Sequence, residues 1–143
     1  MHKLDEYFQN CLYFSAAALS RSITRMAEEE FKVLGLSPSH AFLLMLALEK
    51  GRTSQKEIAS AMHLAPSTVT RFVDSLMHKG LLEREQESRT VFALPTKKAK
   101  DLGPEMEAAW HRLYVRYSEI LGKEQGDELT KTIFKANLQL EQA

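Results

Sequence analysis

The period of the apolar positions changes once within residues 54–95, and this change constrains the fold more than any other feature of the chain. Ser54 and Glu57 have the spacing of a capping box, in which a hydroxyl and a carboxylate satisfy free amides at the start of a helix. They predict a short helix over residues 55–62. The next residues, HLAP, indicate a tight turn before a second helix.

This second helix is expected from Pro66 to just before Gly80. Its apolar residues recur at spacings of three and four, which predicts one buried face: Val69, Phe72, Val73, Leu76 and Met77. Polar residues lie on or near the opposite side: Ser67, Thr68, Arg71, Ser75 and His78. After Gly80 the segments LLEREQ and TVFALP alternate around ESRT, which predicts a two-stranded hairpin, or wing.

The chain before this segment is helical in period. Residues 4–31 place apolar side chains at every third or fourth position and predict one long helix. A break at Gly35 is followed by Ser37 and Pro38, which mark the start of the next helix. That helix, to about Lys50, is apolar nearly all round and should lie at the centre of the core.

The chain after the wing is also helical in period. A helix is expected from Thr96, with a kink or a restart at Gly103 and Pro104, and a last helix follows residues 122–126. The first and last helices carry more apolar surface than a winged core of about fifty residues can cover. They therefore predict a homodimer interface, with extra core of a monomer as the alternative.

The order helix, helix, helix-turn-helix, wing, helix, helix is typical of DNA-binding proteins. In a helix-turn-helix, the second helix lies in the major groove with its N-terminal residues at the base edges. Hydroxyls and an arginine suit phosphates and bases. We therefore expect DNA contacts from the polar face of the second helix: Ser67, Thr68, Thr70, Arg71 and Ser75.

Charge and composition agree with this interpretation. The 143 residues have no formal net charge, but residues 53–100 hold eight basic against five acidic side chains, which is a charge of +3, so the rest of the chain carries −3.

The chain has no run of about eighteen apolar residues, and its first residues, MHKLDEYFQN, do not resemble a signal peptide. We expect a cytoplasmic protein without membrane contact. Cys11, the single cysteine, cannot form an intramolecular disulfide.

Motifs for catalysis or cofactors are absent from the sequence. It contains no G-x-S-x-G, P-loop, G-x-G-x-x-G or CxxC, so no enzyme and no cofactor are expected. No two of the five histidines have the i, i+4 spacing of a helical zinc site: His2, His40, His63, His78 and His111. We expect no metal; the alternative is a zinc site formed by His40, Glu107 and His111.

Three segments resemble the multiple-antibiotic-resistance regulator (MarR) family. They are GLSPSHAFLLMLAL in the core helix, KEIASAMHLAPSTVTRFVDSLMHKGLLERE in the helix-turn-helix, and ESRTVFALPTKKAKDL in the wing and the following helix. The resemblance implies that residues 67–71 begin the recognition helix. It also implies that the wing tip, Ser88 and Arg89 after the acid Glu87, contacts DNA, with the arginine in the minor groove.

The resemblance further implies a homodimer on an inverted-repeat operator of double-stranded DNA. Relatives bind small phenolic effectors in a crevice between the helical scaffold and the winged module. We accordingly expect an effector pocket, for a phenolic or other apolar molecule, that includes Cys11, Phe14, His40, Trp110 and Tyr114. Cys11 also lies near the reactive cysteine of hydroperoxide sensors of this family, but it shares a helical stripe that looks buried, which favours a structural thiol.

The sequence thus predicts a mainly α fold, a winged helix-turn-helix with a two-stranded wing plus N- and C-terminal dimerisation helices. Residues 1–143 are expected to form one domain, with residues 35–103 binding DNA and residues 1–34 and 104–143 forming the dimerisation region. The expected function is a sequence-specific transcriptional regulator, a repressor released by a small molecule. The alternatives are a module for protein contacts only and a cysteine-based redox-sensing repressor.

Overall fold

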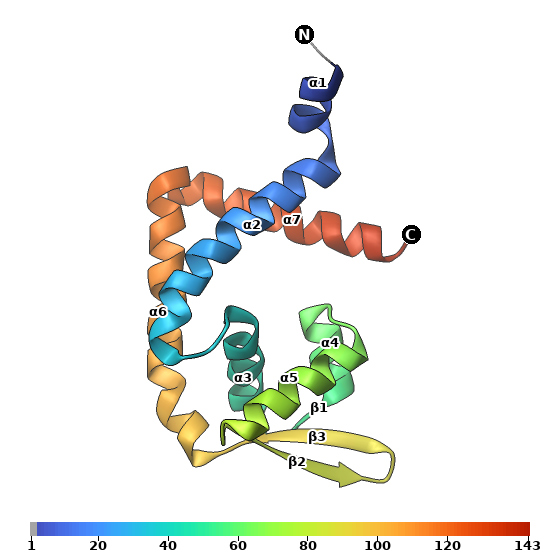
Figure 1. The fold of residues 1–143 in the computed structure, drawn as a ribbon, viewed down its shortest axis with the longest axis vertical. Helices are drawn as coiled ribbons and strands as arrows, with labels where there is room; N and C mark the ends of the chain where they lie inside the picture. The colour runs from blue at the N-terminus through green and yellow to red at the C-terminus, as the bar shows by residue number, and fades with distance from the viewer. Residues whose placement is uncertain (1–2) are drawn as a thin grey trace.

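Two lobes share one long helix in the computed structural model, which describes residues 3–143 and leaves His2 outside its range (Figure 1). The helical lobe contains α1 (Lys3–Asn10), α2 (Leu12–Phe31), α7 (Lys123–Glu141) and the C-terminal half of the shared helix α6 (Lys97–Leu121). The winged lobe follows the short 3-10 helix η1 (Lys32–Leu34) and contains α3 (Pro38–Lys50), β1 (Thr53–Ser54), α4 (Gln55–Met62), α5 (Pro66–His78), β2 (Leu82–Glu87) and β3 (Thr90–Pro95). The predicted winged-helix fold is confirmed.

Helix α3 occupies the centre of the core. The Ser37 hydroxyl accepts a hydrogen bond from the amide of His40 at 3.2 Å, and Gly51 ends the helix with φ 81°, a conformation that favours glycine. Leu43, Leu44 and Ala47 are completely buried. The helix packs against α2, α6 and β3, as its apolar composition predicts.

The wing is part of a three-stranded antiparallel sheet with the order β1-β3-β2. In β2 and β3, Glu87 pairs with Thr90, so Ser88 and Arg89 form a two-residue turn. The third strand, β1, pairs Ser54 with Phe92. The sequence did not predict β1, because a strand of two residues is too short to show alternation.

The N-terminal helix differs from the prediction. It is broken at Cys11, which has the extended angles φ −95° and ψ 120°, and the Asn10 side chain donates a hydrogen bond to the carbonyl of Glu6 at 2.9 Å. Helix α1 has no buried residue in the single chain, although Phe8 on it packs against Phe14 of α2 with ring centroids 4.7 Å apart. The break also leaves Cys11 half-buried and Ser15 exposed, so the predicted buried stripe was wrong for the single chain.

Helix α6 runs without a restart through Pro104, contrary to one of the expected alternatives. Pro104 is exposed, so the hydrogen bond that its ring removes lies on the solvent side, where water can satisfy the free carbonyl. Helix α7 begins at Lys123 and includes Gly126, which is buried against the ring of Tyr117. The last helix therefore starts earlier than expected.

The single chain leaves the apolar faces of the helical lobe uncovered. On α1 and α2 the exposed apolar side chains are Leu4, Tyr7, Phe8, Leu12, Tyr13, Phe14 and Leu19, and on α7 they are Leu129, Ile133, Phe134, Leu138 and Leu140. These residues are not extra core of a monomer, so that alternative was wrong. Within residues 3–143 no single helix has the length and hydropathy to cross a membrane; only a pair bent by 63°, residues 12–34 with residues 38–50, meets those criteria together.

Candidate nucleic-acid interface

The N-terminal turns of α5 present a polar surface. Val69, Val73 and Leu76 are fully buried and fix the inner face of the helix. Because this face is buried, the opposite face of α5 is directed away from the core. Ser67, Thr70 and Arg71 are exposed, and Thr68 and Ser75 are half-buried. Arg71 Nη2 lies 3.4 Å from Thr68 Oγ1, which orients the guanidinium along the start of the helix.

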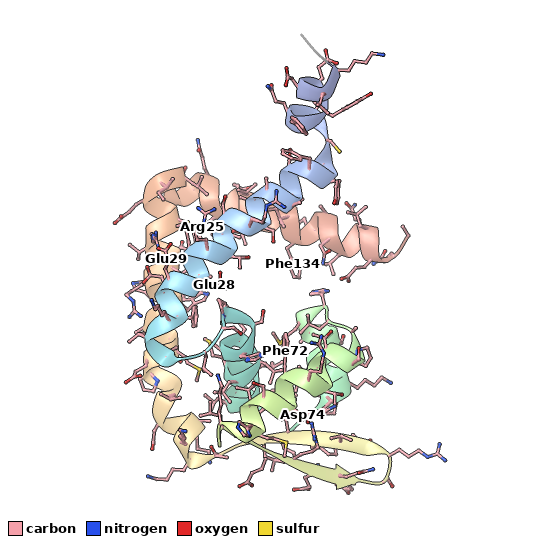
Figure 2. The ribbon with its side chains drawn as sticks, viewed as in Figure 1. Arg25, Glu28, Glu29, Phe72, Asp74 and Phe134 are labelled. Atoms are coloured by element: carbon pink, nitrogen blue, oxygen red, sulfur yellow. The ribbon has the colours of Figure 1, made fainter. Side chains whose placement is uncertain are left out.

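A polar network fixes α5 relative to α4 and the wing. Gln55 Nε2 donates to Thr70 Oγ1 at 3.1 Å, and the Thr70 hydroxyl donates to the carbonyl of Pro66 at 3.1 Å. Gln55 Oε1 accepts a hydrogen bond from Arg84 Nε at 3.3 Å, and Arg84 also pairs with Asp74, which Figure 2 shows on α5 above the hairpin. Thr70 thus has a structural partner that the sequence did not reveal.

The α4 end of this network is capped as predicted. Ser54 Oγ accepts the amide of Glu57 at 3.0 Å and donates to Glu57 Oε1 at 3.1 Å. A surface hollow of about 410 Å³ separates the start of α4 from the wing, and its rim includes Lys56 and Arg89. The first helix of the helix-turn-helix and the wing therefore border one hollow.

The wing tip is held in a tight turn. Ser88 has φ 57°, in the left-handed region that costs energy for a residue with a side chain, and both Ser88 and Arg89 are exposed. A two-residue turn with a positive φ matches the twist of the hairpin. Arg89 consequently projects at the end of the wing, away from the core.

The four arginines of the winged lobe fall into two pairs. Arg52 binds Glu85 and Glu87, and Arg84 binds Asp74. The hydrogen bonds that Arg52 donates to Glu87 and Glu85 raise the pKa of Arg52 above its usual value. By contrast, Arg71 and Arg89 form no ion pair with any carboxylate of residues 3–143.

The model of the MarR family matches residues 36–89, from just before α3 to the wing tip. This winged segment belongs to the MarR family. The resemblance inferred from the three sequence segments is therefore confirmed. No curated protein matches the chain.

Solved structures share the MarR-type fold over nearly the whole chain. BldR, a transcriptional regulator from Sulfolobus solfataricus, is 26% identical, with a TM-score of 0.74 over 97% of this chain and 99% of that one. Mutant MarR from E. coli, complexed with operator DNA, is 16% identical, with a TM-score of 0.80 over 91% and 96%. CouR from Rhodococcus jostii RHA1, bound to p-coumaroyl-CoA, is 21% identical, with a TM-score of 0.76 over 88% and 91%. The MarR family and its structural neighbours are transcriptional regulators and not enzymes, as the sequence predicted.

The five residues expected at an effector pocket are not gathered at one place in the single chain. Trp110 stacks on Tyr114, with ring centroids 5.6 Å apart, and Tyr114 donates a hydrogen bond to Asp127 at 2.9 Å. Phe14 and Cys11 lie on α2 and at its start, and His40 packs edge-on against Phe72 at 4.5 Å within the winged lobe. No cavity described for the chain brings the five together, so the pocket stays a prediction.

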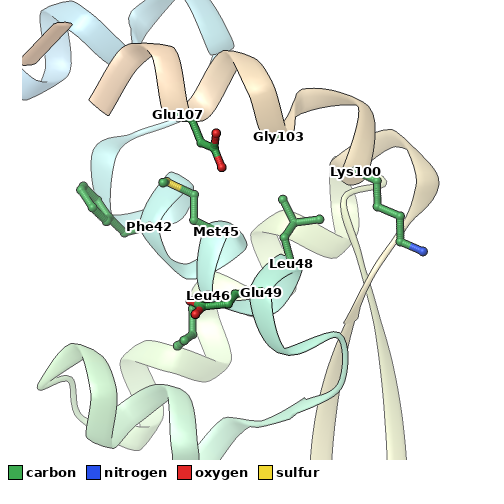
Figure 3. A pocket seen from close by; sticks show the side chains of 8 residues that line it. All are labelled: Phe42, Met45, Leu46, Leu48, Glu49, Lys100, Gly103 and Glu107. Carbon is green, nitrogen blue, oxygen red and sulfur yellow. The ribbon is translucent and has the colours of Figure 1, made fainter. Parts of the chain in front are cut away.

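Another hollow lies between α3 and α6 (Figure 3). Its volume is about 680 Å³, and Phe42, Met45 and Leu48 line it from α3. Figure 3 shows the Glu107 carboxylate directed into the space and the Lys100 amine directed away from it. The sequence did not indicate this hollow, because α3 is apolar on all sides and its period does not show which side is left open. Within residues 3–143 no three His, Cys, Asp or Glu side chains form a group suited to a metal ion, so His40, Glu107 and His111 do not form one.

Proposed function

We propose that this transcriptional regulator of the MarR family binds an inverted-repeat operator as a homodimer and represses transcription. The observation that carries the proposal is the pair of arginines, Arg71 and Arg89, that no carboxylate of the described chain neutralises. Arg52 and Arg84 on the same lobe are both neutralised. The arginine charge available to DNA therefore lies at the start of α5 and at the wing tip.

These two positions match the two grooves of DNA. The start of α5 can enter the major groove, where Arg71 can bind O6 and N7 of guanine through two hydrogen bonds. Ser67 and Thr68 can bond to phosphates or to base edges nearby. Arg89 at the wing tip can enter the minor groove, whose negative potential increases where the groove is narrow.

The uncovered apolar faces of α1, α2 and α7 support a homodimer. Exposed residues such as Leu12 and Leu140 would lie in water in the single chain, and burying such a surface against a second copy is favourable. Two copies related by a two-fold axis would bring two α5 helices to one face of DNA, which is why an inverted repeat is expected. In this arrangement residues 35–103 bind DNA and the flanking helices form the dimer.

Release by a small apolar or phenolic effector is the finer part of the proposal. One structural neighbour is a complex with operator DNA and another is a complex with p-coumaroyl-CoA, so this fold accommodates both kinds of partner in other proteins. The dimer would surround Trp110 and Tyr114 with further helices, and the stacked rings offer a planar apolar surface. A ligand that prefers the DNA-free arrangement of the lobes would lower operator affinity.

Selection of bound sequences from random DNA, followed by titration, tests the proposal. We expect the selected site to be an inverted repeat, bound by two chains, with an affinity that falls steeply as salt increases. Random DNA of equal length should bind at least about a thousandfold more weakly than the selected site. Equal affinity for selected and random DNA would contradict a sequence-specific regulator. The absence of binding to either DNA would favour the alternative of a module used for protein contacts only.

A further inference from the structure

We infer that Arg52 is a positioning residue for DNA binding, which holds the wing so that Arg89 reaches the minor groove. The inference rests on the proposed function, in which Arg89 contacts DNA. It adds a residue that lies outside both DNA-binding elements and that the sequence did not single out. Arg52 is in the short connection between α3 and β1.

The Arg52 guanidinium touches both strands of the hairpin. Nη2 lies 2.9 Å from Glu85 Oε1 and 2.5 Å from Glu87 Oε2, both on β2. The guanidinium carbon lies 3.6 Å from the ring centroid of Phe92 on β3. Phe92 is the cross-strand neighbour of Glu85, so the three contacts surround one point of the hairpin.

This point is the last one at which the hairpin has support from the rest of the lobe. Strand β1 pairs only with Ala93 and Phe92, and the hairpin beyond that register, from Gln86 to Val91, is two-stranded. A two-stranded ribbon has little stability of its own and twists readily. A guanidinium whose Nη2 binds two carboxylates and whose plane lies over a ring restricts that motion where it begins.

The contacts also change the charge beside Arg89. Glu85 and Glu87 together carry −2, and Arg52 reduces the sum to −1. Two free carboxylates near the wing tip would repel DNA phosphates and would also attract the Arg89 side chain. Arg52 binds both of them and leaves Arg89 without a carboxylate partner among the described residues.

A double-mutant cycle between Arg52 and Arg89 tests the inference on the selected operator at one salt concentration. Arg52→Gln should weaken operator binding by about threefold to tenfold, the range expected for coupled neighbouring sites. In the Arg89→Ala background the same substitution should have no further effect, because the wing then has no arginine to position. Arg52→Lys keeps the charge but lacks the planar guanidinium that lies over Phe92, so it should restore only part of the affinity.

Three measurements complete the design. Arg25→Gln removes the same charge from α2 of the other lobe (Figure 2) and should leave affinity unchanged. The midpoint of thermal unfolding separates loss of the fold from loss of wing position, and we expect Arg52→Gln to lower it by only a few degrees, about what an exposed ion pair contributes. The slope of log affinity against log salt should stay the same for Arg52→Gln, whereas a lost phosphate contact would reduce it by about one.

The possible failures can be distinguished. An Arg52→Gln protein that binds operator as tightly as the wild type, or losses that add in the double variant, would overturn the positioning role while leaving the proposed function intact. A reduced salt slope would show that Arg52 contacts a phosphate directly and would overturn it as well. If the wild type does not prefer the operator, or if Arg89→Ala has no effect, the proposed function itself fails.

Discussion

His63 and Glu141 connect the turn of the helix-turn-helix to the end of the last helix. Nδ1 of His63 lies 2.8 Å from Oε1 and 3.0 Å from Oε2 of Glu141, and Phe134 approaches the imidazole edge-on with centroids 6.4 Å apart. Figure 2 shows Phe134 on the side of α7 that faces the winged lobe. The contact links the two lobes within one chain, beside the dimerisation surface.

Glu141→Gln should loosen this link without unfolding the protein. The pair is partly exposed, so we expect the free energy of unfolding to change by less than about 1 kcal/mol. Hydrogen exchange at the amides of His63 and Leu64 should become faster, since the α4–α5 turn loses its partner. Glu128→Gln, which removes another exposed carboxylate from α7, serves as the control. Unchanged exchange in the Glu141 variant would contradict a role for the contact in ordering the turn.

Arg71→Ala should reduce the preference for particular base pairs. If Arg71 binds guanine through two hydrogen bonds, its loss should cost about 1 to 3 kcal/mol on the operator and much less on random DNA. Binding curves on operators with each base pair changed in turn measure this. A parallel loss on operator and random DNA would show that Arg71 contacts the backbone and does not read a base.

Deletion of the chain after Gly122 should abolish the dimer, because it removes the apolar face of α7. Leu140→Glu is a milder variant, since Leu140 is 62% exposed in the single chain and the substitution should leave the fold of each chain intact. Analytical ultracentrifugation gives the association state of both proteins. A truncated protein that remains a dimer and binds DNA would place the interface elsewhere.

The stability of the fold should depend on pH through His40. Burial, and to a smaller extent the charge of Lys79, lowers the pKa of His40 below its usual 6.5. Below 6.5 the unfolded chain therefore takes up a proton at His40 more readily than the folded chain, and stability falls as the pH decreases through that value. The loss of thermal midpoint between about pH 7.5 and about pH 5.5 should be smaller in His40→Gln than in the wild type. Equal losses in the two proteins would show that other groups cause the effect.

Cys11→Ser should leave operator binding and its release by an effector unchanged. The thiol is half-buried at the break between α1 and α2, and we interpret it as a structural residue. Titration of operator after treatment with an organic hydroperoxide distinguishes the alternatives. Release of the wild type but not of Cys11→Ser would identify Cys11 as a redox sensor, which is the alternative that the sequence left open.

The sequence by itself determined the elements whose signals are local. The hydroxyls of Ser37 and Ser54 bond to amides three residues later, so the starts of α3 and α4 were predictable from a few adjacent residues. The buried face of α5 and the two strands of the wing follow from periods that a short stretch of chain displays. The polar surface with Arg71 and Arg89 is a consequence of these local features and of the resemblance to the MarR family.

Only the tertiary structure decided the features that depend on residues far apart in the sequence. Strand β1 exists because β3, about forty residues later, offers it a partner. Arg52 binds Glu85 and Glu87, which are 33 and 35 positions away in the sequence, and His63 binds Glu141, which is 78 positions away. No local sequence pattern predicts contacts over such separations. The break at Cys11 is a feature of the same kind, because helices gain most of their stability from packing and helix α1 has no residue buried in the core of the single chain.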